Sequence, residues 1–175
     1  MRRTTRAVTA GATGVIAAAL ALGGAALADG NAPTESNGGS IVEDFSYPGA
    51  AGILASQGVE LIGGDGHIIL SDCGAPPAGD IGLIKVYTTN VIGQGGTVCF
   101  KVLGSTGRLD LKVPAVYEIR GDGRTQGAGH EGTATVTTDS GVETTKDLDP
   151  DGSTQFGVGD GGTEPTTLLQ LTVHP

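Results

Sequence analysis

Three aspartates at alternate positions, Asp147, Asp149 and Asp151, precede Gly152. Alternating carboxylates followed by glycine are typical of calcium-binding loops, because a hard cation prefers oxygen ligands and glycine permits the sharp turn. The twelfth position, where an EF-hand loop places a bidentate glutamate, is Val158. The sequence therefore leaves two interpretations open: an acidic turn between two strands, which we favour, or a calcium site of another kind. Calcium is the one cofactor that the sequence suggests.

Two cysteines, Cys73 and Cys99, follow an apparent export signal. An even cysteine count in an exported chain favours a disulfide, because the compartment is oxidising. Closing the loop between them would contribute about 3.5 kcal/mol on the chain-entropy estimate. Neither cysteine has the CxxC spacing or the adjacent histidine of a metal or catalytic thiol site. We expect a Cys73–Cys99 disulfide.

No other group of residues has the spacing of a known catalytic motif. The histidines at 67, 130 and 174 stand apart, without the four-residue spacing of a zinc helix. Ser105 lies between glycines at the wrong spacing for a nucleophile elbow. Carboxylate pairs for glycoside cleavage are not distinguishable in so acidic a chain. Arg120-Gly121-Asp122 spells a tripeptide that some animal adhesion receptors read, which we interpret as a strand end followed by a turn. The sequence predicts no catalytic residues and no enzyme.

The N-terminus predicts export. Residues 1–28 combine three arginines, an alanine-rich apolar stretch and a small-residue ending at Ala26-Leu27-Ala28, as in a signal peptide. The seven basic residues that follow face nineteen acidic ones, a net charge of −12. So acidic a domain does not suit the phosphates of nucleic acid or an anionic membrane. We expect a secreted protein that has an extracellular ligand or protein partner and no membrane association after signal cleavage.

The remaining sequence predicts one domain. Residues 29–40 contain no core-forming side chains and predict a disordered leader, so the domain spans residues 41–175. Pro48 and Gly58 bracket a short apolar segment that predicts a helix. Residues 59–62 and 67–71 flank Gly63-Gly64-Asp65-Gly66, a combination that predicts a hairpin.

The clearest strand is residues 108–120. Its apolar residues share one parity, which predicts one buried and one wet face, and Pro114 predicts a bend or an edge. The apolar set is Leu109, Leu111, Val113, Ala115, Tyr117 and Ile119. Shorter strands are expected at 83–88, 97–103, 133–138, 142–146 and 167–173. Such strands separated by glycine-rich turns predict an all-β, antiparallel, jelly-roll-like β-sandwich with one short N-terminal helix.

Binding residues are expected in the loops of that sandwich, at 90–96, 121–132 and 148–164. Stacking of sugars on aromatic rings is not favoured, because there is no tryptophan and Tyr87, Phe100 and Tyr117 fall in strand patterns typical of a core. Tyr47 and Phe156 are the aromatic residues that we expect near the surface.

The stretches from Val42 to Ala50, Gly64 to Cys73, Cys99 to Val102 and Val113 to Tyr117 resemble small secreted actinobacterial proteins of unknown function. The resemblance implies export, a β-rich domain and a paired cysteine, and it carries no catalytic residues. We expect a non-enzymatic binding or accessory module. The alternatives are a calcium-stabilised structural or adhesive extracellular protein and a hydrolase whose site the sequence does not reveal.

Overall fold

The structure is a computed structural model that describes residues 45–175. The expected signal peptide (1–28) and leader (29–40) lie outside the described residues and stay predictions. The described part contains α1 (Ala50–Gln57), β1 (Glu60–Gly64), β2 (Ile68–Ser71), β3 (Ile84–Thr88), β4 (Thr97–Val102), β5 (Gly107–Arg120), β6 (Glu131–Thr138), β7 (Glu143–Asp147), β8 (Ser153–Gln155), the 3-10 helix η1 (Gly157–Asp160) and β9 (Thr166–His174).

Helix α1 confirms the helix expected between Pro48 and Gly58. Gly58 adopts the left-handed conformation, with φ 69°, and its amide donates to the Leu54 carbonyl at 3.0 Å. This is a glycine C-cap, which satisfies a carbonyl that the helix leaves free at its end. Ile53 packs against the core while Leu54 remains exposed, so the helix contributes a single side chain to the packing.

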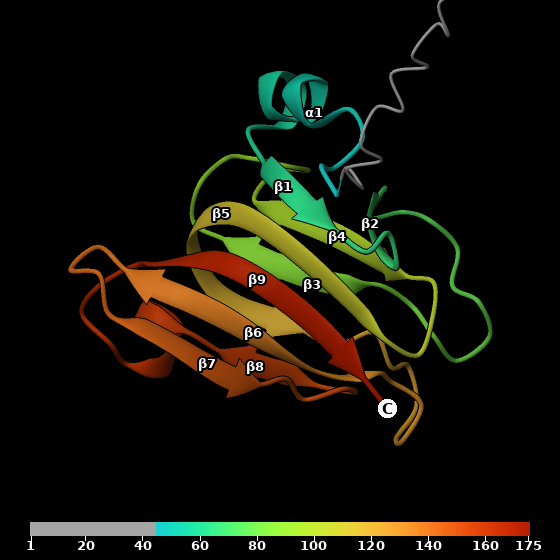
Figure 1. Cartoon of the computed structure of the whole chain (residues 1–175). Coiled ribbons are helices and arrows are strands. Elements are labelled where there is room, and N and C mark those ends of the chain that lie inside the picture. Colours follow the sequence, from blue (N-terminus) through green and yellow to red (C-terminus); the bar gives the residue numbers. More distant parts are fainter. Residues whose placement is uncertain (1–44) are drawn as a thin grey trace, which may run out of the picture. The chain divides into compact units, whose positions relative to one another are not determined.

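The strands of residues 45–175 form one hydrogen-bonded, antiparallel sheet in the order β2-β4-β3-β5-β9-β6-β7, and β1 and β8 each pair with β5 (Figure 1). The expected antiparallel β-rich class with one short helix is therefore confirmed. The central strand, β5, has four partners: β1, β3, β8 and β9. The first part of β5 pairs with β1, and its last residues pair with β3 and β8.

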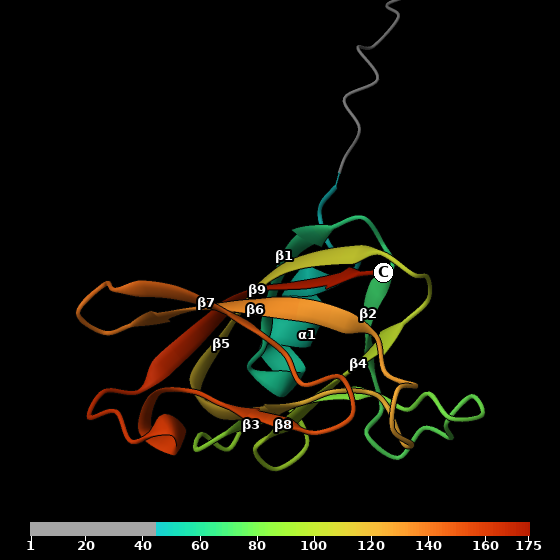
Figure 2. The same cartoon turned by 90° about the horizontal axis from the view of Figure 1, so that it is seen from below.

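Strand β5 changes direction at Pro114 and Ala115, as the proline predicted. Ala115 has a φ of 54°, and the pairing with β9 shifts register on both sides of Val113. The carbonyls at the bend keep their partners, since Pro114 accepts from the Thr88 hydroxyl at 2.6 Å and Ala115 from the Thr89 amide at 3.0 Å. Figure 2 shows β5 curving from the level of β1, β9 and β6 to that of β3 and β8.

The bend corrects part of the predicted burial pattern. Leu109, Leu111, Val113 and Ile119 are fully buried, as expected, but directly beyond the bend the buried residue is Val116 and not Ala115. Tyr117 is only half-buried, because the register with β3 shifts beside it, and its ring lies 6.3 Å from that of Tyr87. Both halves of β5 still contribute to a single core cluster, together with Phe100, Leu168 and Leu171.

The hairpin predicted around residues 63–66 is wrong. The two expected strands exist, but β1 pairs with β5, and β2 pairs with β4. The reason lies in Asp65, whose carboxylate accepts the amides of His67 and Arg108, both at 3.0 Å. The connection is thereby tied to the start of β5, and it carries the chain from one strand pair to another.

The segment 148–164, predicted as an open loop, contains β8 and η1. Phe156, expected near the surface, is fully buried. The amide of Phe156 donates to the Tyr117 carbonyl at 2.9 Å, which extends the pairing of β8 with β5 and carries the ring into the core. In the described range, no helix has both the length and the apolar character needed to span a bilayer.

Candidate functional site

The three candidate calcium ligands lie at the end of β7 and in the loop after it, and two of them have backbone partners. Asp147 is the last residue of β7, opposite Thr133. The Asp149 carboxylate accepts the Asp151 amide at 3.1 Å, and the Asp151 carboxylate accepts the Gly129 amide at 2.8 Å. Among residues 45–175, no three His, Cys, Asp or Glu side chains are grouped so that they could hold a metal ion. Calcium binding stays a prediction.

Asp151 acts as a link between two loops. Its carboxylate accepts from the amides of both Gly127 and Gly129, and these hydrogen bonds hold the pKa of Asp151 below its ordinary value. The expected binding loops 121–132 and 148–164 are thus brought together. The charge that the sequence offered as a metal ligand serves to fix one loop against the other.

Glycines let these two loops pack backbone against backbone. A Cβ atom at Gly121 would lie 2.2 Å from the Pro150 carbonyl oxygen, and one at Gly129 would lie 2.0 Å from the same atom. The amide of Gly123 donates to the Pro150 carbonyl at 2.9 Å. We call this contact between residues 121–132 and 148–152 the loop junction. At Gly121 and Gly129 the two backbones are therefore in direct contact.

A hydrogen-bonded pair of an aspartate and a histidine completes the loop junction. Asp122 is 2% exposed, and its carboxylate accepts from the His130 amide at 2.9 Å and pairs with His130 Nδ1 at 2.7 Å. The aspartate of the Arg120-Gly121-Asp122 tripeptide is therefore enclosed, as the turn interpretation requires. A carboxylate that orients an imidazole is also found in catalytic dyads. This pair, however, joins the two ends of one loop.

The disulfide between Cys73 and Cys99 is present, with an S–S distance of 2.06 Å, and confirms the sequence prediction. Cys99 lies in β4 and is buried, whereas Cys73 follows β2. The bond therefore fixes the start of the long connection between β2 and β3 to the sheet.

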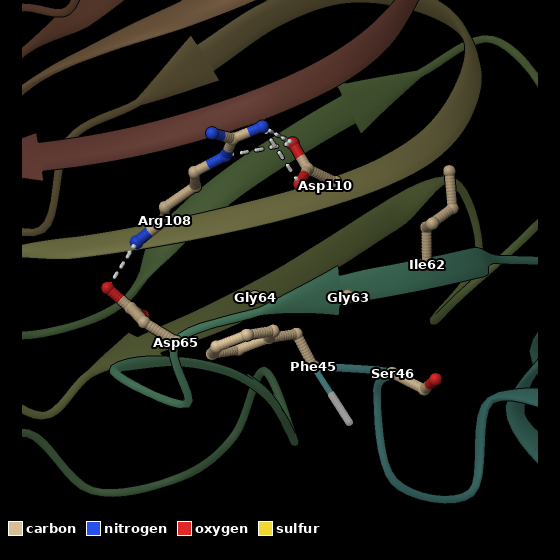
Figure 3. Close-up of a pocket in the computed structure, with 8 residues that line it drawn as sticks. All are labelled: Phe45, Ser46, Ile62, Gly63, Gly64, Asp65, Arg108 and Asp110. Atoms are coloured by element: carbon tan, nitrogen blue, oxygen red, sulfur yellow. Dashed lines mark hydrogen bonds and ion pairs between the residues drawn. The ribbon is translucent and has the colours of Figure 1, made fainter. Parts of the chain in front are cut away.

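A hollow with apolar walls lies along β1, where the sequence indicated no site. It has a volume of about 640 Å³ and is lined by Phe45, Ser46, Ile62, Gly63, Gly64, Asp65, Arg108 and Asp110 (Figure 3). Phe45 is 61% exposed and Ile62 is 47% exposed. Large apolar side chains this exposed are costly in water, so two of them on one hollow mark a contact surface. We call this hollow the Phe45 groove.

Two consecutive glycines build the floor of the Phe45 groove. A Cβ at Gly63 would lie 2.5 Å from the Phe45 carbonyl oxygen, and one at Gly64 would lie 2.3 Å from the Arg108 carbonyl oxygen. Because glycine has no Cβ atom, the chain at Phe45 can lie against the edge of β1. There the Gly64 amide donates to the Phe45 carbonyl at 2.9 Å. Glycine pairs inside a strand indicate such a close backbone approach. That signal was available in the sequence, where it was interpreted as a turn.

The polar wall of the Phe45 groove is charged but internally paired. The Arg108 guanidinium contacts the Asp110 carboxylate at 3.2 Å, and Asp110 also accepts from the Gln170 side chain at 2.7 Å. Partial burial tends to raise the pKa of Asp65, but the amides of His67 and Arg108 outweigh it and hold that pKa below its ordinary value. Asp65 is therefore ionised at neutral pH. The wall carries two carboxylates against one guanidinium, a small negative excess.

A second hollow of about 650 Å³ adjoins the Phe45 groove. Phe45, Ser46, Gly64 and Asp65 line both hollows, and the second adds apolar surface from Tyr47, Ile53, Ile68 and Leu70, among others. The Tyr47 hydroxyl accepts the Leu70 amide at 2.7 Å, which satisfies a donor on edge strand β2. Phe45 thus stands between two adjoining hollows and is accessible from both.

The Phe45 groove combines polar groups with exposed apolar surface. Its polar atoms offer charge and hydrogen bonds at the rim, while its apolar side chains offer surface to be buried. No family model matches the chain, and a comparison with curated proteins finds no match either. The function therefore has to be argued from the geometry alone.

Proposed function

We propose that this protein is an exported, non-enzymatic binding or accessory module that holds a segment of an extracellular protein partner in the Phe45 groove. The proposal is carried by one observation: the exposed Phe45 and Ile62 side chains line the same groove of about 640 Å³. Such a volume accommodates one or two side chains of a partner. In this view the two parts of the bent sheet on either side of Ala115 serve as the layers of a β-sandwich scaffold.

The charge of the groove suggests what the partner segment contains. Asp65 and Asp110 contribute two carboxylates, and Arg108 contributes one guanidinium. A segment with a large apolar side chain beside a basic one would bury its apolar part against Phe45 and Ile62 and place its cation near the carboxylates. Electrostatic complementarity of this kind favours one partner over another more than it raises affinity.

The proposal treats the polar groups of the groove as orienting groups and not as catalysts. Arg108 and Asp110 contact each other, and Asp65 accepts two backbone amides. Export is supported by the Cys73–Cys99 disulfide, since such bonds persist in oxidising compartments. Small secreted actinobacterial proteins of unknown function, the class that the sequence resembles, are also expected to be exported and to carry a paired cysteine.

The experiment is a selection of short random peptides displayed on phage against the purified protein, followed by anisotropy measurements on the enriched peptides. We expect enrichment of an apolar residue next to lysine or arginine. Phe45→Ser and Ile62→Ser should each weaken binding about tenfold or more, because burying such a side chain contributes about 1.5–3 kcal/mol.

Val91→Ser is the matched control. Val91 is 92% exposed and does not line the Phe45 groove, so its replacement removes apolar surface elsewhere. We expect it to leave peptide binding unchanged. Failure to enrich any peptide, or equal binding by Phe45→Ser, Ile62→Ser and Val91→Ser, would contradict the proposal.

A further inference from the structure

A third hollow gathers much of the positive charge of the domain. It has a volume of about 350 Å³ and lies between the segment 73–85 and residues 120–124. Lys85, Arg120 and Arg124 line it, which is three of the seven basic residues found after residue 44. This hollow shares no lining residue with the Phe45 groove. We call it the cationic pocket.

Two of these cations lie opposite each other on neighbouring strands of the sheet. Lys85 of β3 and Arg120 of β5 are direct partners in the antiparallel register, so their side chains emerge on the same face. Directly opposed residues have Cβ atoms about 4.5–5.5 Å apart, and like charges in this position destabilise the sheet. The chain is rich in carboxylates, with nineteen in all, yet none is placed opposite either cation in this pair.

The charges of the pair are left without a close counter-ion. Arg108, Lys112 and Lys146 have carboxylate partners in Asp110, Glu60 and Asp160. Within residues 45–175, no ion pair joins Lys85 or Arg120 to a carboxylate. The carboxylate of Glu118 accepts from the side chains of Ser153 and Gln155, which lower its pKa, and the charge of Arg120 adds to this effect.

The walls of the cationic pocket are fixed. The Arg124 guanidinium donates to the Gly79 carbonyl at 3.0 Å, and its amide donates to the Asp80 carbonyl at 2.9 Å. The opposite wall begins at Cys73, which the disulfide ties to Cys99, the β4 partner of Lys85. Asp122 is the one acidic lining residue, and its carboxylate is buried against His130. The pocket is therefore preorganised around positive charge.

We propose that the cationic pocket binds the oxyanion of a phosphate or sulfate group. A guanidinium offers two parallel N–H donors to such a group, and an ammonium adds a compact charge. The anion between Lys85 and Arg120 replaces their mutual repulsion with attraction, and Arg124 provides a further guanidinium at the rim. The volume of about 350 Å³ also admits part of the molecule that carries the group. This site is separate from the groove of the proposed function.

Calorimetric titration of the purified protein with inorganic phosphate, inorganic sulfate and glucose 6-phosphate tests the site, and glucose is the neutral control. We expect the anions to bind and glucose not to. Lys85→Gln and Arg120→Gln should each weaken binding about tenfold, the effect of losing one charge-assisted contact. Lys101→Gln is the matched control, because Lys101 is an exposed cation on neighbouring β4 that does not line the pocket. It should change the affinity less than threefold.

Measurements of the Tm distinguish anion binding at the cationic pocket from a general effect of surface charge. Without anions at low salt, Lys85→Gln should raise the Tm, because it removes the cross-strand repulsion. Anions should raise the Tm of the unaltered protein more than that of the variant. Stronger binding of glucose 6-phosphate than of inorganic phosphate would assign the site to an ester, and equal binding would assign it to the free ion. Absence of binding, or equal weakening by Lys85→Gln and Lys101→Gln, would overturn the proposal.

Discussion

The loop junction and the Phe45 groove contain the same residue types, but one is a closed backbone contact and the other is an open hollow. Both combine glycines with aspartates near a strand end. At the junction, Gly121 and Gly129 let two loops touch, and Asp122 and Asp151 bind backbone amides, so the two backbones are held in contact. In the groove, Gly63 and Gly64 let the chain at Phe45 lie against β1, and a hollow of about 640 Å³ remains above them.

The difference shows what an aspartate among glycines does in this chain. Asp65, Asp122, Asp149 and Asp151 each accept a backbone amide, and three of them join segments distant in sequence or hold the ends of a loop. Carboxylates used in this way are structural links. What distinguishes the groove is the exposure of Phe45 and Ile62, and not its acidity.

The largest effect is expected at the junction, in Gly129→Ala. The added Cβ would lie 2.0 Å from the Pro150 carbonyl oxygen and 2.9 Å from the Gly123 amide nitrogen, so the backbone of one loop has to move. Overpacking against backbone should cost about 3 kcal/mol of unfolding free energy, measured by urea denaturation. Gly52→Ala is the control, because Gly52 lies in α1 with nothing near its Cβ position. It should be neutral or stabilising by up to about 1 kcal/mol.

A smaller loss is expected when the buried aspartate is removed. Asp122→Ala leaves the His130 amide and ring without their acceptor, so we expect a loss of about 2 kcal/mol. Asp110→Ala is the matched change in the groove, where the pair with Arg108 is exposed and contributes under about 1 kcal/mol. Equal losses in the two variants would show that the junction is no more tightly closed than the groove.

A pH dependence is expected from Asp151. The amides of Gly127 and Gly129 lower its pKa in the folded state, so its contribution to stability is present above the unfolded-state pKa near 4 and is lost as the pH falls through the folded value. Asp151→Asn should therefore flatten the fall in the urea midpoint below about pH 4. Asp139→Asn, the same change in an exposed turn, should leave the pH dependence of the urea midpoint unchanged.

Much of the fold follows from local patterns in the sequence. The alternation from Arg108 to Val113 predicts the first part of β5, and Gly58 predicts the end of α1. Local patterns do not specify which strands pair, and this is why the segments around residues 63–66 were taken for a hairpin. Their partners are set by long-range hydrogen bonds, such as the one from the Arg108 amide to Asp65. The bend at Ala115 likewise shifts burial to Val116, a shift that strict parity misses.

The candidate sites were harder to predict than the fold. Asp149 and Asp151 attracted attention as alternating acidic residues. Asp149 accepts the amide of Asp151, but Asp151 accepts the amide of Gly129, which lies in a loop about twenty residues away. Phe45 and Ile62 belong to no sequence motif. Whether an apolar side chain is exposed can be recognised only once the residues of the core are known. The pairing of Lys85 with Arg120 depends on register, which composition does not contain. The Cys73–Cys99 disulfide was predictable because the cysteines had no other partner in the chain.

The smallest effect is expected from calcium, and it tests whether the junction is only structural. Because the carboxylates of Asp149 and Asp151 accept backbone amides, calcium and sodium chloride at equal ionic strength should raise the Tm alike, through screening of the acidic surface. A site would behave differently, since binding to the native state adds stability beyond screening. A shift of several degrees at millimolar calcium that disappears in Asp149→Ala would mean that the aspartates exchange their amide partners for the metal. The junction would then be a ligand site, and its contrast with the Phe45 groove would fail.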